Sequence, residues 1–452
     1  MSEITAKENK MGTMPIPKLL ITMSLPMMVS MLVQAAYNIV DSMFVAKLSE
    51  DALTAVSLAF PIQNLMISVA AGTGVGINSL LSRNLGEGRP DEANKAAQNG
   101  IFIIILSAIL FAIVGGSCSH LFFETQTSNS IIIRYGSQYM FVVTVGSFGI
   151  FLQIVFERLL QSTGRTIYNM YTQGLGAIIN IILDPILIFG LGPFPKLEVL
   201  GAAIATITGQ LIAVMLSLYF NIKKNRELNI NMKGFRPNRD VILAIYKVGL
   251  PSIFMQAIGS VMVFGMNKIL LLFSTTAAAV YGVYFKLQSF IFMPIFGLTN
   301  GMIPIVAYNY GAKNKKRIYS TLKLSLIYAS SIMLIGLIVF QFFAAELLSI
   351  FDASDSMLDI GVPALRIISI SFIVAGFCII ISSMFQALGN GVYSLIMSAG
   401  RQLAVILPVA YFFAKTFGLH MVWWAVPVAE IISLSICVFF LIRINRLKLK
   451  NL

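Results

Sequence analysis

The chain has 452 residues, of which 11% are charged and 57% are hydrophobic, and its formal net charge is +13. A soluble domain averages about 25% charged residues, so this composition excludes an ordinary soluble protein. The basic residues lie mainly between apolar runs, and basic loops of a membrane protein explain the positive charge without a nucleic-acid partner.

Long runs without Asp, Glu, Lys or Arg identify the class of protein. Four such runs cover residues 96–123, 199–222, 324–345 and 367–400. Apolar runs of about 18 residues or more are typical of membrane-spanning helices. We therefore predict an all-α membrane protein with twelve transmembrane helices. In chain order, the predicted spans are 17–44, 53–80, 96–119, 132–156, 166–188, 199–222, 241–272, 278–305, 320–344, 360–384, 393–414 and 420–442.

The charge of the loops predicts the orientation of the spans. Lys and Arg gather before the first span and after spans two, four, six, eight and twelve, whereas the other loops hold only Lys47, Lys196 and Lys415. By the positive-inside rule, we predict that both termini are cytoplasmic.

The second half of the sequence repeats the first half with an offset of 225 residues. A register kept across half the chain indicates two structural repeats. Six spans per repeat is an even number, so we expect parallel lobes with the substrate path between them. The predicted parts are a first lobe at 1–222, a cytoplasmic linker at 223–240 and a second lobe at 241–452. The recurring motifs are Ser24-Leu25-Pro26 with Gly249-Leu250-Pro251, Asn84-Leu85-Gly86 with Asn309-Tyr310-Gly311, and Gln161-Ser162-Thr163-Gly164 with Gln386-Ala387-Leu388-Gly389.

Acidic residues within the spans of the first lobe are candidates for ion binding, because intramembrane charge is costly. Asp41 and Asp184 both fall in the outer third of spans that run outward, so we expect them at the same depth. Asn180 lies one helical turn before Asp184, and Asn38 lies three residues before Asp41. Carboxylates with amide oxygens predict a site for H⁺ or Na⁺. The alternatives are a headgroup-layer position for Asp41 and a structural pairing for Asp184.

Other polar residues in the spans are candidates for the substrate cavity. Gln34 and Tyr37 share a span with Asp41. In the second lobe, Lys286 and Glu430 fall at similar depths, which raises three possibilities: a functional pair, a structural ion pair or separate contacts. The positions of the second repeat that are equivalent to Asp41, Asn180 and Asp184 are Met266, Val405 and Val409.

Pro26 lies within the first span. A bend there either converts protonation of Asp41 into movement or is static.

Motifs for catalysis and metal binding are lacking. No Gly-x-x-x-x-Gly-Lys-Ser/Thr loop occurs, both histidines map to outer ends of spans, and the cysteines, Cys118, Cys378 and Cys437, have no metal-ligand spacing. We predict a protein that is not an enzyme and holds no cofactor or metal.

Several motifs together resemble one family over essentially the whole chain. They are Ser24-Leu25-Pro26, Asn38-Ile39-Val40-Asp41, Asn180-Ile181-Ile182-Leu183-Asp184-Pro185 and Pro304-Ile305-Val306-Ala307-Tyr308-Asn309-Tyr310-Gly311-Ala312. They are similar to motifs of the multidrug and toxic compound extrusion (MATE) family. The resemblance implies an antiporter of the inner (plasma) membrane that exports organic cations and drugs by alternating access, against entry of H⁺ or Na⁺. We expect it to work as a monomer.

The resemblance also implies which residues bind the coupling ion. Acids of the family stand at the positions of Asp41 and Asp184, with an asparagine at Asn180. The hydroxyl that often completes the cluster has Thr206 as its nearest candidate, whereas alanine occupies the expected place, and this favours H⁺ over Na⁺. The alternative is a flippase for lipid-linked oligosaccharide or lipid precursors, a relative that often lines its cavity with many Arg and Lys.

Overall fold

The computed structural model describes residues 9–351, 353–450 and 452, and within these residues it contains helices and no strand. The helices of the first half are α1 (Lys10–Thr13), α2 (Ile16–Leu48), α3 (Glu50–Gly86), α4 (Pro90–Gln126), α5 (Ser130–Val145), α6 (Phe148–Ser162), α7 (Ile167–Phe189) and α8 (Val199–Lys224). Those of the second half are α9 (Arg239–Leu270), α10 (Thr275–Gly311), α11 (Lys315–Phe342), α12 (Ala344–Ser349), α13 (Asp355–Ser369), α14 (Phe372–Ala387), α15 (Gly391–Ala399), the π-helix η1 (Gly400–Ile406), α16 (Leu407–Phe417), α17 (Leu419–Val422), α18 (Ala425–Ile444) and the π-helix η2 (Asn445–Leu449).

The predicted twelve spans are confirmed once two bent helices are each counted as one span. In the described part of the chain, ten helices are long and apolar enough to cross a membrane, and two bent pairs complete the set. The pairs are α5 with α6, bent by 41°, and α13 with α14, bent by 49°. The breaks, at 146–147 and 370–371, fall at nearly equivalent places in the two repeats, one residue out of the 225-residue register.

Several helices continue beyond their predicted ends. α3 and α10 reach Gly86 and Gly311, whereas their spans were expected to stop at 80 and 305. Polar residues such as Arg83 end the apolar run, but they do not interrupt the backbone hydrogen bonds of a helix. The apolar run therefore marks the part inside the bilayer and underestimates the length of the helix.

Equivalent serines begin the second long helix of each half. The Ser49 hydroxyl accepts a hydrogen bond from the Ala52 N–H, and the Ser274 hydroxyl accepts one from the Ala277 N–H, each at 3.0 Å. Such caps satisfy N–H groups that the first turn of a helix leaves free. The repeat thus preserves helix starts as well as apolar runs.

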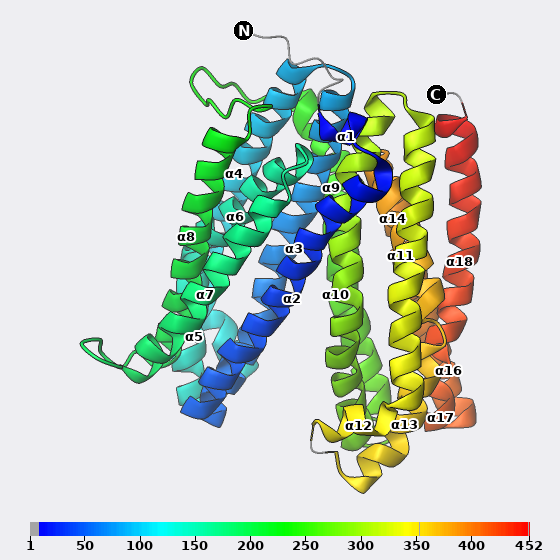
Figure 1. The fold of residues 1–452 in the computed structure, drawn as a ribbon. Coiled ribbons are helices and arrows are strands. Elements are labelled where there is room, and N and C mark those ends of the chain that lie inside the picture. The colour runs from blue at the N-terminus through cyan, green and yellow to red at the C-terminus, as the bar shows by residue number, and fades with distance from the viewer. Residues whose placement is uncertain (1–8, 352, 451) are drawn as a thin grey trace.

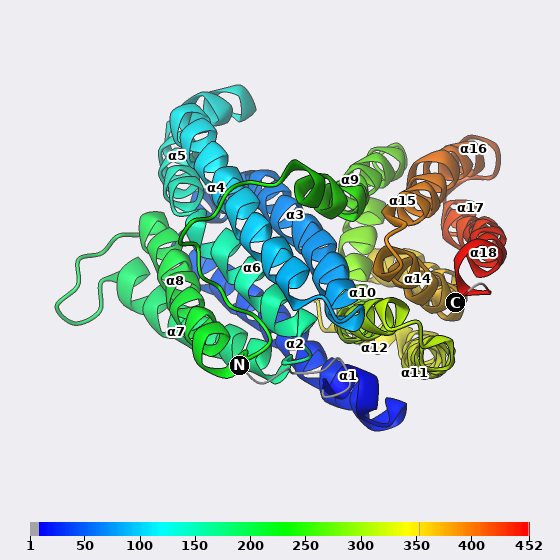
Figure 2. The ribbon, with the colours of Figure 1, turned by 90° about the horizontal axis from the view of Figure 1, so that it is seen from above.

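The helices form two lobes, one from each half of the chain. Figure 1 shows the lobes meeting at the end that carries α1 and η2, and separating toward the opposite end. Contact between the lobes is made mainly by α2 against α10 and by α9 against α3. The path of the chain in Figure 2, seen from above, places the segment between α8 and α9 across the top of α4.

Glycines allow the two lobes to approach each other at backbone distance. A Cβ atom on Gly86 would lie 1.9 Å from the Tyr308 carbonyl oxygen, and one on Gly311 would lie 2.2 Å from the Arg83 carbonyl oxygen. These two contacts exchange when 225 is added to or subtracted from each residue number. Such reciprocity is the mark of a two-fold relation between parallel repeats. The same exchange relates Gly72 with Ile253 to Gly297 with Met28, and Gly76 with Gly249 to Gly301 with Ser24.

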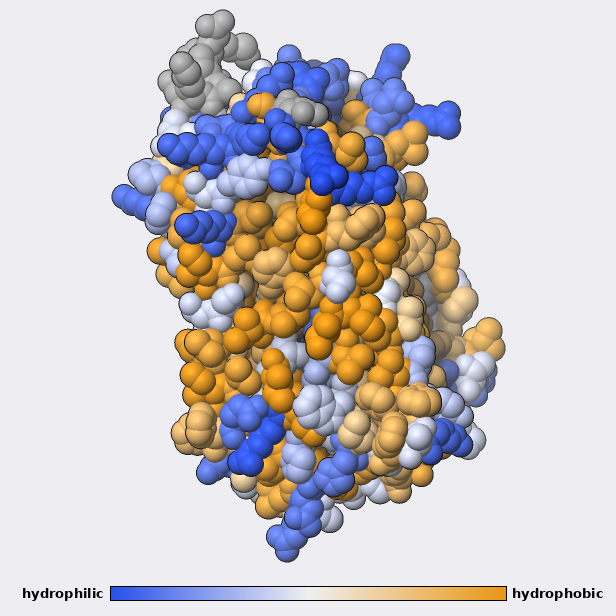
Figure 3. Space-filling model, turned by 90° about the vertical axis from the view of Figure 1, so that its right-hand side faces the viewer, coloured by the Kyte–Doolittle hydropathy of each residue, from blue (hydrophilic) through white to orange (hydrophobic). Residues whose placement is uncertain are grey.

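The outer surface is that of a multi-pass membrane protein. Figure 3 shows a broad band of hydrophobic residues around the middle of one face and hydrophilic residues gathered at the end that carries η2. Large apolar side chains such as Phe60, Phe264 and Phe342 are 61%, 65% and 73% exposed. In water this exposure would be unfavourable, whereas the hydrocarbon core of a bilayer covers it.

The segment between α8 and α9 is tied to α4 of the first lobe. The Asn229 N–H donates to Asn94 Oδ1, and the Asn238 N–H donates to Asn99 Oδ1, both at 2.8 Å. Gln98 Nε2 donates to the Asn231 carbonyl oxygen at 2.6 Å. The segment that connects the two lobes is therefore bound to the first lobe by hydrogen bonds.

We expect Gly86→Ala to destabilise the protein by about 1–3 kcal/mol, because the added methyl group overlaps the backbone of the other lobe. Gly174→Ala in α7 is the matched control, because a Cβ atom there meets no other atom within 4 Å. Thermal unfolding in detergent, followed with a thiol-reactive dye on buried Cys378 and Cys437, measures the difference. Equal melting temperatures for the two variants would contradict the close-packing argument.

Candidate functional site

Asp41 of α2 and Asp184 of α7 come together inside the first lobe, as predicted from their depth. Their carboxyl groups lie close enough to interact directly, and the Asp184 side chain is fully buried. Two ionised carboxylates have no proton to donate, so a hydrogen bond between them requires one shared proton. The arrangement can therefore hold a proton between the two carboxyl groups.

Asn180 joins Asp184 to α8. In the orientation that satisfies both amide atoms, Asn180 Nδ2 donates to Asp184 Oδ2 at 3.2 Å, and its oxygen accepts from the Thr206 N–H at 3.2 Å. The Thr206 hydroxyl also lies 3.4 Å from the Asn180 amide. The structure therefore brings together Asp41, Asp184, Asn180 and Thr206 from three helices.

Asn38 lies apart from this cluster. It is on an exposed side of α2, and its backbone oxygen accepts a hydrogen bond from the Ser42 hydroxyl at 2.9 Å. Among the described residues, its side chain makes no hydrogen bond to Asp41. A direct role of Asn38 in ion binding stays a prediction.

A cavity of about 690 Å³ lies between the two lobes and takes its wall from both. Of the predicted cavity residues, Gln34, Tyr37 and Glu430 line it and Lys286 does not. Asn180 and Thr206 also line it, whereas Asp41 and Asp184 are not among its lining residues. The carboxyl pair thus lies behind the wall of the cavity, within the first lobe.

The suggested pair of Lys286 with Glu430 is wrong. Glu430 pairs with Arg401 of η1, with Arg401 Nη1 donating to Glu430 Oε1 at 2.6 Å. Lys286 is exposed, and its Nζ lies 5.8 Å from the centre of the Phe351 ring. Similar depth in two spans does not fix the rotation of either helix, and rotation decides which side chains meet.

The Arg401–Glu430 pair has no charged counterpart in the first repeat, where the equivalent residues are Gly176 and Ala205. Arg401 stands in a π-helical turn, a feature that is frequent at functional sites.

Cys378 and Cys437, which are distant in sequence, lie close together in the second lobe, where their thiols interact.

Sequence reasoning missed Glu157, the other buried acid of the cavity wall. Glu157 is 5% exposed and lies on α6. The predicted fourth span ended at 156, so Glu157 and Arg158 were assigned to a loop, whereas α6 continues to Ser162. A charged residue inside a helical turn ends an apolar run without ending the helix, which is why composition alone hid it.

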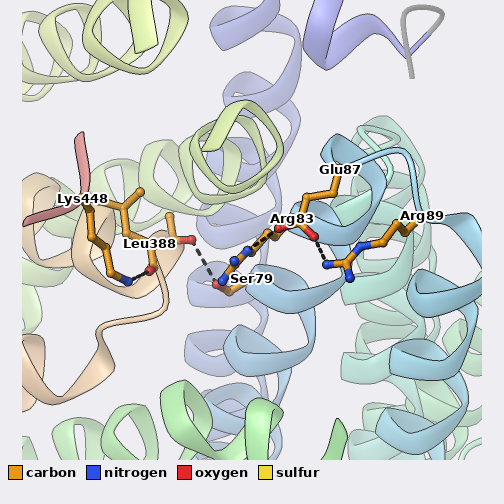
Figure 4. Close-up of polar contacts among 7 residues, drawn as sticks. Ser79, Arg83, Glu87, Arg89, Leu388 and Lys448 are labelled. Atoms are coloured by element: carbon orange, nitrogen blue, oxygen red, sulfur yellow. Dashed lines mark hydrogen bonds and ion pairs between the residues drawn. The ribbon is translucent and has the colours of Figure 1, made fainter. Parts of the chain in front are cut away.

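Polar contacts seal the cavity at the end of the molecule that carries α1 and η2. The Ser79 hydroxyl donates to the carbonyl oxygens of Gln386 and Ala387 at 2.9 and 3.1 Å, and Lys448 Nζ donates to the Leu388 carbonyl oxygen at 2.8 Å. Figure 4 shows Ser79 directed at the turn that contains Leu388, beside the Arg83–Glu87–Arg89 ion pairs. Deeper in the cavity, Arg158 Nη1 donates to Asn300 Oδ1 at 2.9 Å and Gln161 donates to the Asn300 carbonyl oxygen.

Pro26 is buried within α2, which continues as one helix on both sides of it. Its carbonyl oxygen accepts a hydrogen bond from the Ser30 hydroxyl at 2.9 Å. Its role as a moving hinge stays a prediction.

The chain belongs to the MatE family, whose model matches residues 26–186 and 251–412. The two matched segments begin 225 residues apart, in agreement with the internal repeat. Members of this family are membrane transporters, so the predicted class of protein, a MATE transporter and not an enzyme, is confirmed.

Individual relatives are similar over nearly their whole length. The chain is 28% identical over 433 residues to a protein of Shewanella oneidensis named FAD transporter, covering 95% of each chain. It is 27% identical over 432 residues to the multidrug export protein MepA of Staphylococcus haemolyticus, covering 95% of this chain and 94% of that one. A solved structure described as an outward-facing multidrug resistance MATE family transporter matches 99% of this chain and 100% of its own, with a TM-score of 0.92 and 26% identity.

We expect Arg401→Met to destabilise the protein by about 3 kcal/mol, because it leaves the buried Glu430 carboxylate without its cationic partner. Adding Glu430→Leu to that variant should recover most of the loss, since no buried charge then remains. Melting temperatures of the purified single and double variants in detergent check this. A double variant no more stable than Arg401→Met would show that the pair is not energetically coupled.

Proposed function

We propose that this transporter exports amphipathic organic cations and drugs in exchange for cation entry, with H⁺ as the coupling ion rather than Na⁺. The observation that carries the proposal is the direct interaction of Asp41 with Asp184 beside a large cavity shared by two lobes. A proton bridges two carboxyls directly, whereas Na⁺ requires several oxygen ligands around one point. The proposal includes no cofactor and a monomeric protein.

Alternating access follows from the relation of the two lobes. The cavity is sealed at the end that carries α1 and η2, where the glycine contacts and the Ser79 hydrogen bonds join the two lobes. The positive-inside rule makes this end cytoplasmic, in the plasma (inner) membrane. The structure then represents the state open to the outside, and the inward state requires that this seal breaks while the lobes tilt.

Asn180 and Thr206 offer a route from the ion site to the substrate. Both line the cavity, and Asn180 contacts Asp184 on the other side. A change in the protonation of the carboxyl pair changes the hydrogen bonds that Asn180 makes. Proton binding inside the first lobe thereby alters the cavity wall that holds the substrate.

We expect the single variants Asp41→Asn and Asp184→Asn each to reduce proton-driven efflux to near the rate of protein-free liposomes. The reason is that an amide cannot take up and release a proton at these positions. Efflux of ethidium from proteoliposomes under an imposed pH gradient measures this. The control is Asp359→Asn in the distant helix α13, which should transport at the wild-type rate. Full ion-driven efflux by either variant at normal protein levels would overturn the coupling proposal.

A second candidate substrate class is the anionic flavin nucleotides, because one relative is named FAD transporter. The observation that favours it is the pair of arginines in the cavity wall, Arg158 and Arg401. Guanidinium groups bind phosphate through paired hydrogen bonds. In this chain, however, Arg401 is already neutralised by Glu430, which favours the cation proposal.

The two candidates predict different cargo in one experiment. Proteoliposomes loaded with either ethidium or FAD and energised by the same pH gradient should release ethidium several times faster than protein-free controls, with FAD retained. Release of FAD with retention of ethidium would establish the flavin-nucleotide function instead.

A further inference from the structure

Glu157 is a buried carboxylate in the cavity wall that the coupling cluster does not use. Neutral donors surround it: Gln153 Nε2 and the Thr172 hydroxyl donate to Oε1 at 3.1 and 3.0 Å, and Gln173 Nε2 donates to Oε2 at 2.7 Å. Within the described chain, Glu157 has no lysine, arginine or histidine nitrogen within 4.0 Å. The adjacent Arg158 acts on Glu157 only through space, because its Nη1 donates to Gln161 and Asn300 and no ion pair joins it to Glu157 among the described residues.

Two further acceptors beside Glu157 are left without donors. Asn169 is 1% exposed, and its Nδ2 donates to the Glu157 carbonyl oxygen at 3.1 Å, which fixes the orientation of the amide. Its Oδ1 and the Oε1 of Gln173 are buried and accept no hydrogen bond from the described residues. Both residues line the cavity. A buried acceptor without a donor is energetically unfavourable. A ligand that donates hydrogen bonds to these oxygens would remove this cost.

We propose that Glu157, with Asn169 and Gln173, binds the cationic nitrogen group of the transported substrate at a place separate from the Asp41–Asp184 proton site. This assignment rests on the proposed export of organic cations. A protonated amine or amidine supplies the positive charge that Glu157 lacks and the N–H donors that the two amide oxygens lack. Its ligand class is therefore that of amphipathic amines and amidines.

The surroundings fit the apolar part of such a molecule. Met27 and Met31 of α2 line the same cavity, and methionine side chains adapt to ligands of varied shape. Tyr37 lies within electrostatic range of Glu157 and also of Asp41 and Asp184. The cationic group and the coupling proton are thus placed in the same lobe, whereas the second repeat has uncharged Ser382 at the position of Glu157.

Equilibrium binding of ethidium, a fluorescent planar cation with amino groups, to purified protein in detergent tests the site without any ion gradient. We expect Glu157→Gln to weaken ethidium binding about tenfold or more, and Glu157→Asp, which keeps the charge, to stay within about threefold of wild type. Glu346→Gln, at an exposed acid of α12, is the matched control and should bind like wild type. Wild-type affinity in a folded Glu157→Gln protein overturns the proposal, as does a wild-type protein that binds no ethidium.

A second variant keeps the test decisive if Glu157→Gln does not fold. Gln173→Met retains the size of the side chain and the Glu157 charge but removes the free acceptor, together with the Nε2 donor to Glu157, and it should weaken ethidium binding about threefold or more. Unchanged affinity in that variant counts against the site.

Asp41→Asn separates the two proposals. Loss of proton-driven efflux with ethidium affinity intact in this variant supports two separate sites, whereas loss of both overturns the separation. Failure of proton coupling in the wild-type protein would leave the binding difference at Glu157 standing.

Discussion

The close approach of the two lobes at glycine positions is the constraint on which the rest of the structure depends. At Gly86 and Gly311 the backbones pass so near each other that no side chain fits between them. The contacts occur in reciprocal pairs, so each lobe offers the same surface to the other around a two-fold axis. Because these surfaces lie toward one end, the lobes separate toward the other end, and a cavity of about 690 Å³ remains between them.

The two-fold symmetry of the repeats accounts for the arrangement of the helices. The charged residues of the cavity are found where the two repeats differ. The first lobe places the acids Asp41, Glu157 and Asp184 at or near the cavity wall, and their equivalents in the second lobe are Met266, Ser382 and Val409. The second lobe instead carries the Arg401–Glu430 pair, whose equivalents in the first lobe are Gly176 and Ala205. The cavity wall therefore has an acid without an ion-pair partner, Glu157, in the first lobe and a neutralised ion pair in the second, so a cation is expected to bind at the first-lobe side.

In the exchange that we propose, two acidic sites of the first lobe bind different ligands: the Asp41–Asp184 pair binds the proton and Glu157 binds the substrate. Neither Asp41 nor Asp184 lines the cavity; Asp184 is fully buried and Asp41 is half-buried. Glu157 faces the cavity and is surrounded by neutral donors and free acceptors. Asn180 contacts Asp184, and Tyr37 lies within electrostatic range of Asp41, Asp184 and Glu157, so electrostatics connect the two sites.

The sequence by itself determined the membrane class, the twelve spans, the internal repeat and the similar depth of Asp41 and Asp184. Apolar run length, loop charge and a constant offset are local or periodic signals, and each follows directly from the chemistry of a bilayer. Only the tertiary structure decided that Glu430 pairs with Arg401 rather than Lys286, that Asn38 lies apart, and that Glu157 enters the cavity. Those outcomes depend on how each helix is rotated and where it ends, and packing between helices sets both.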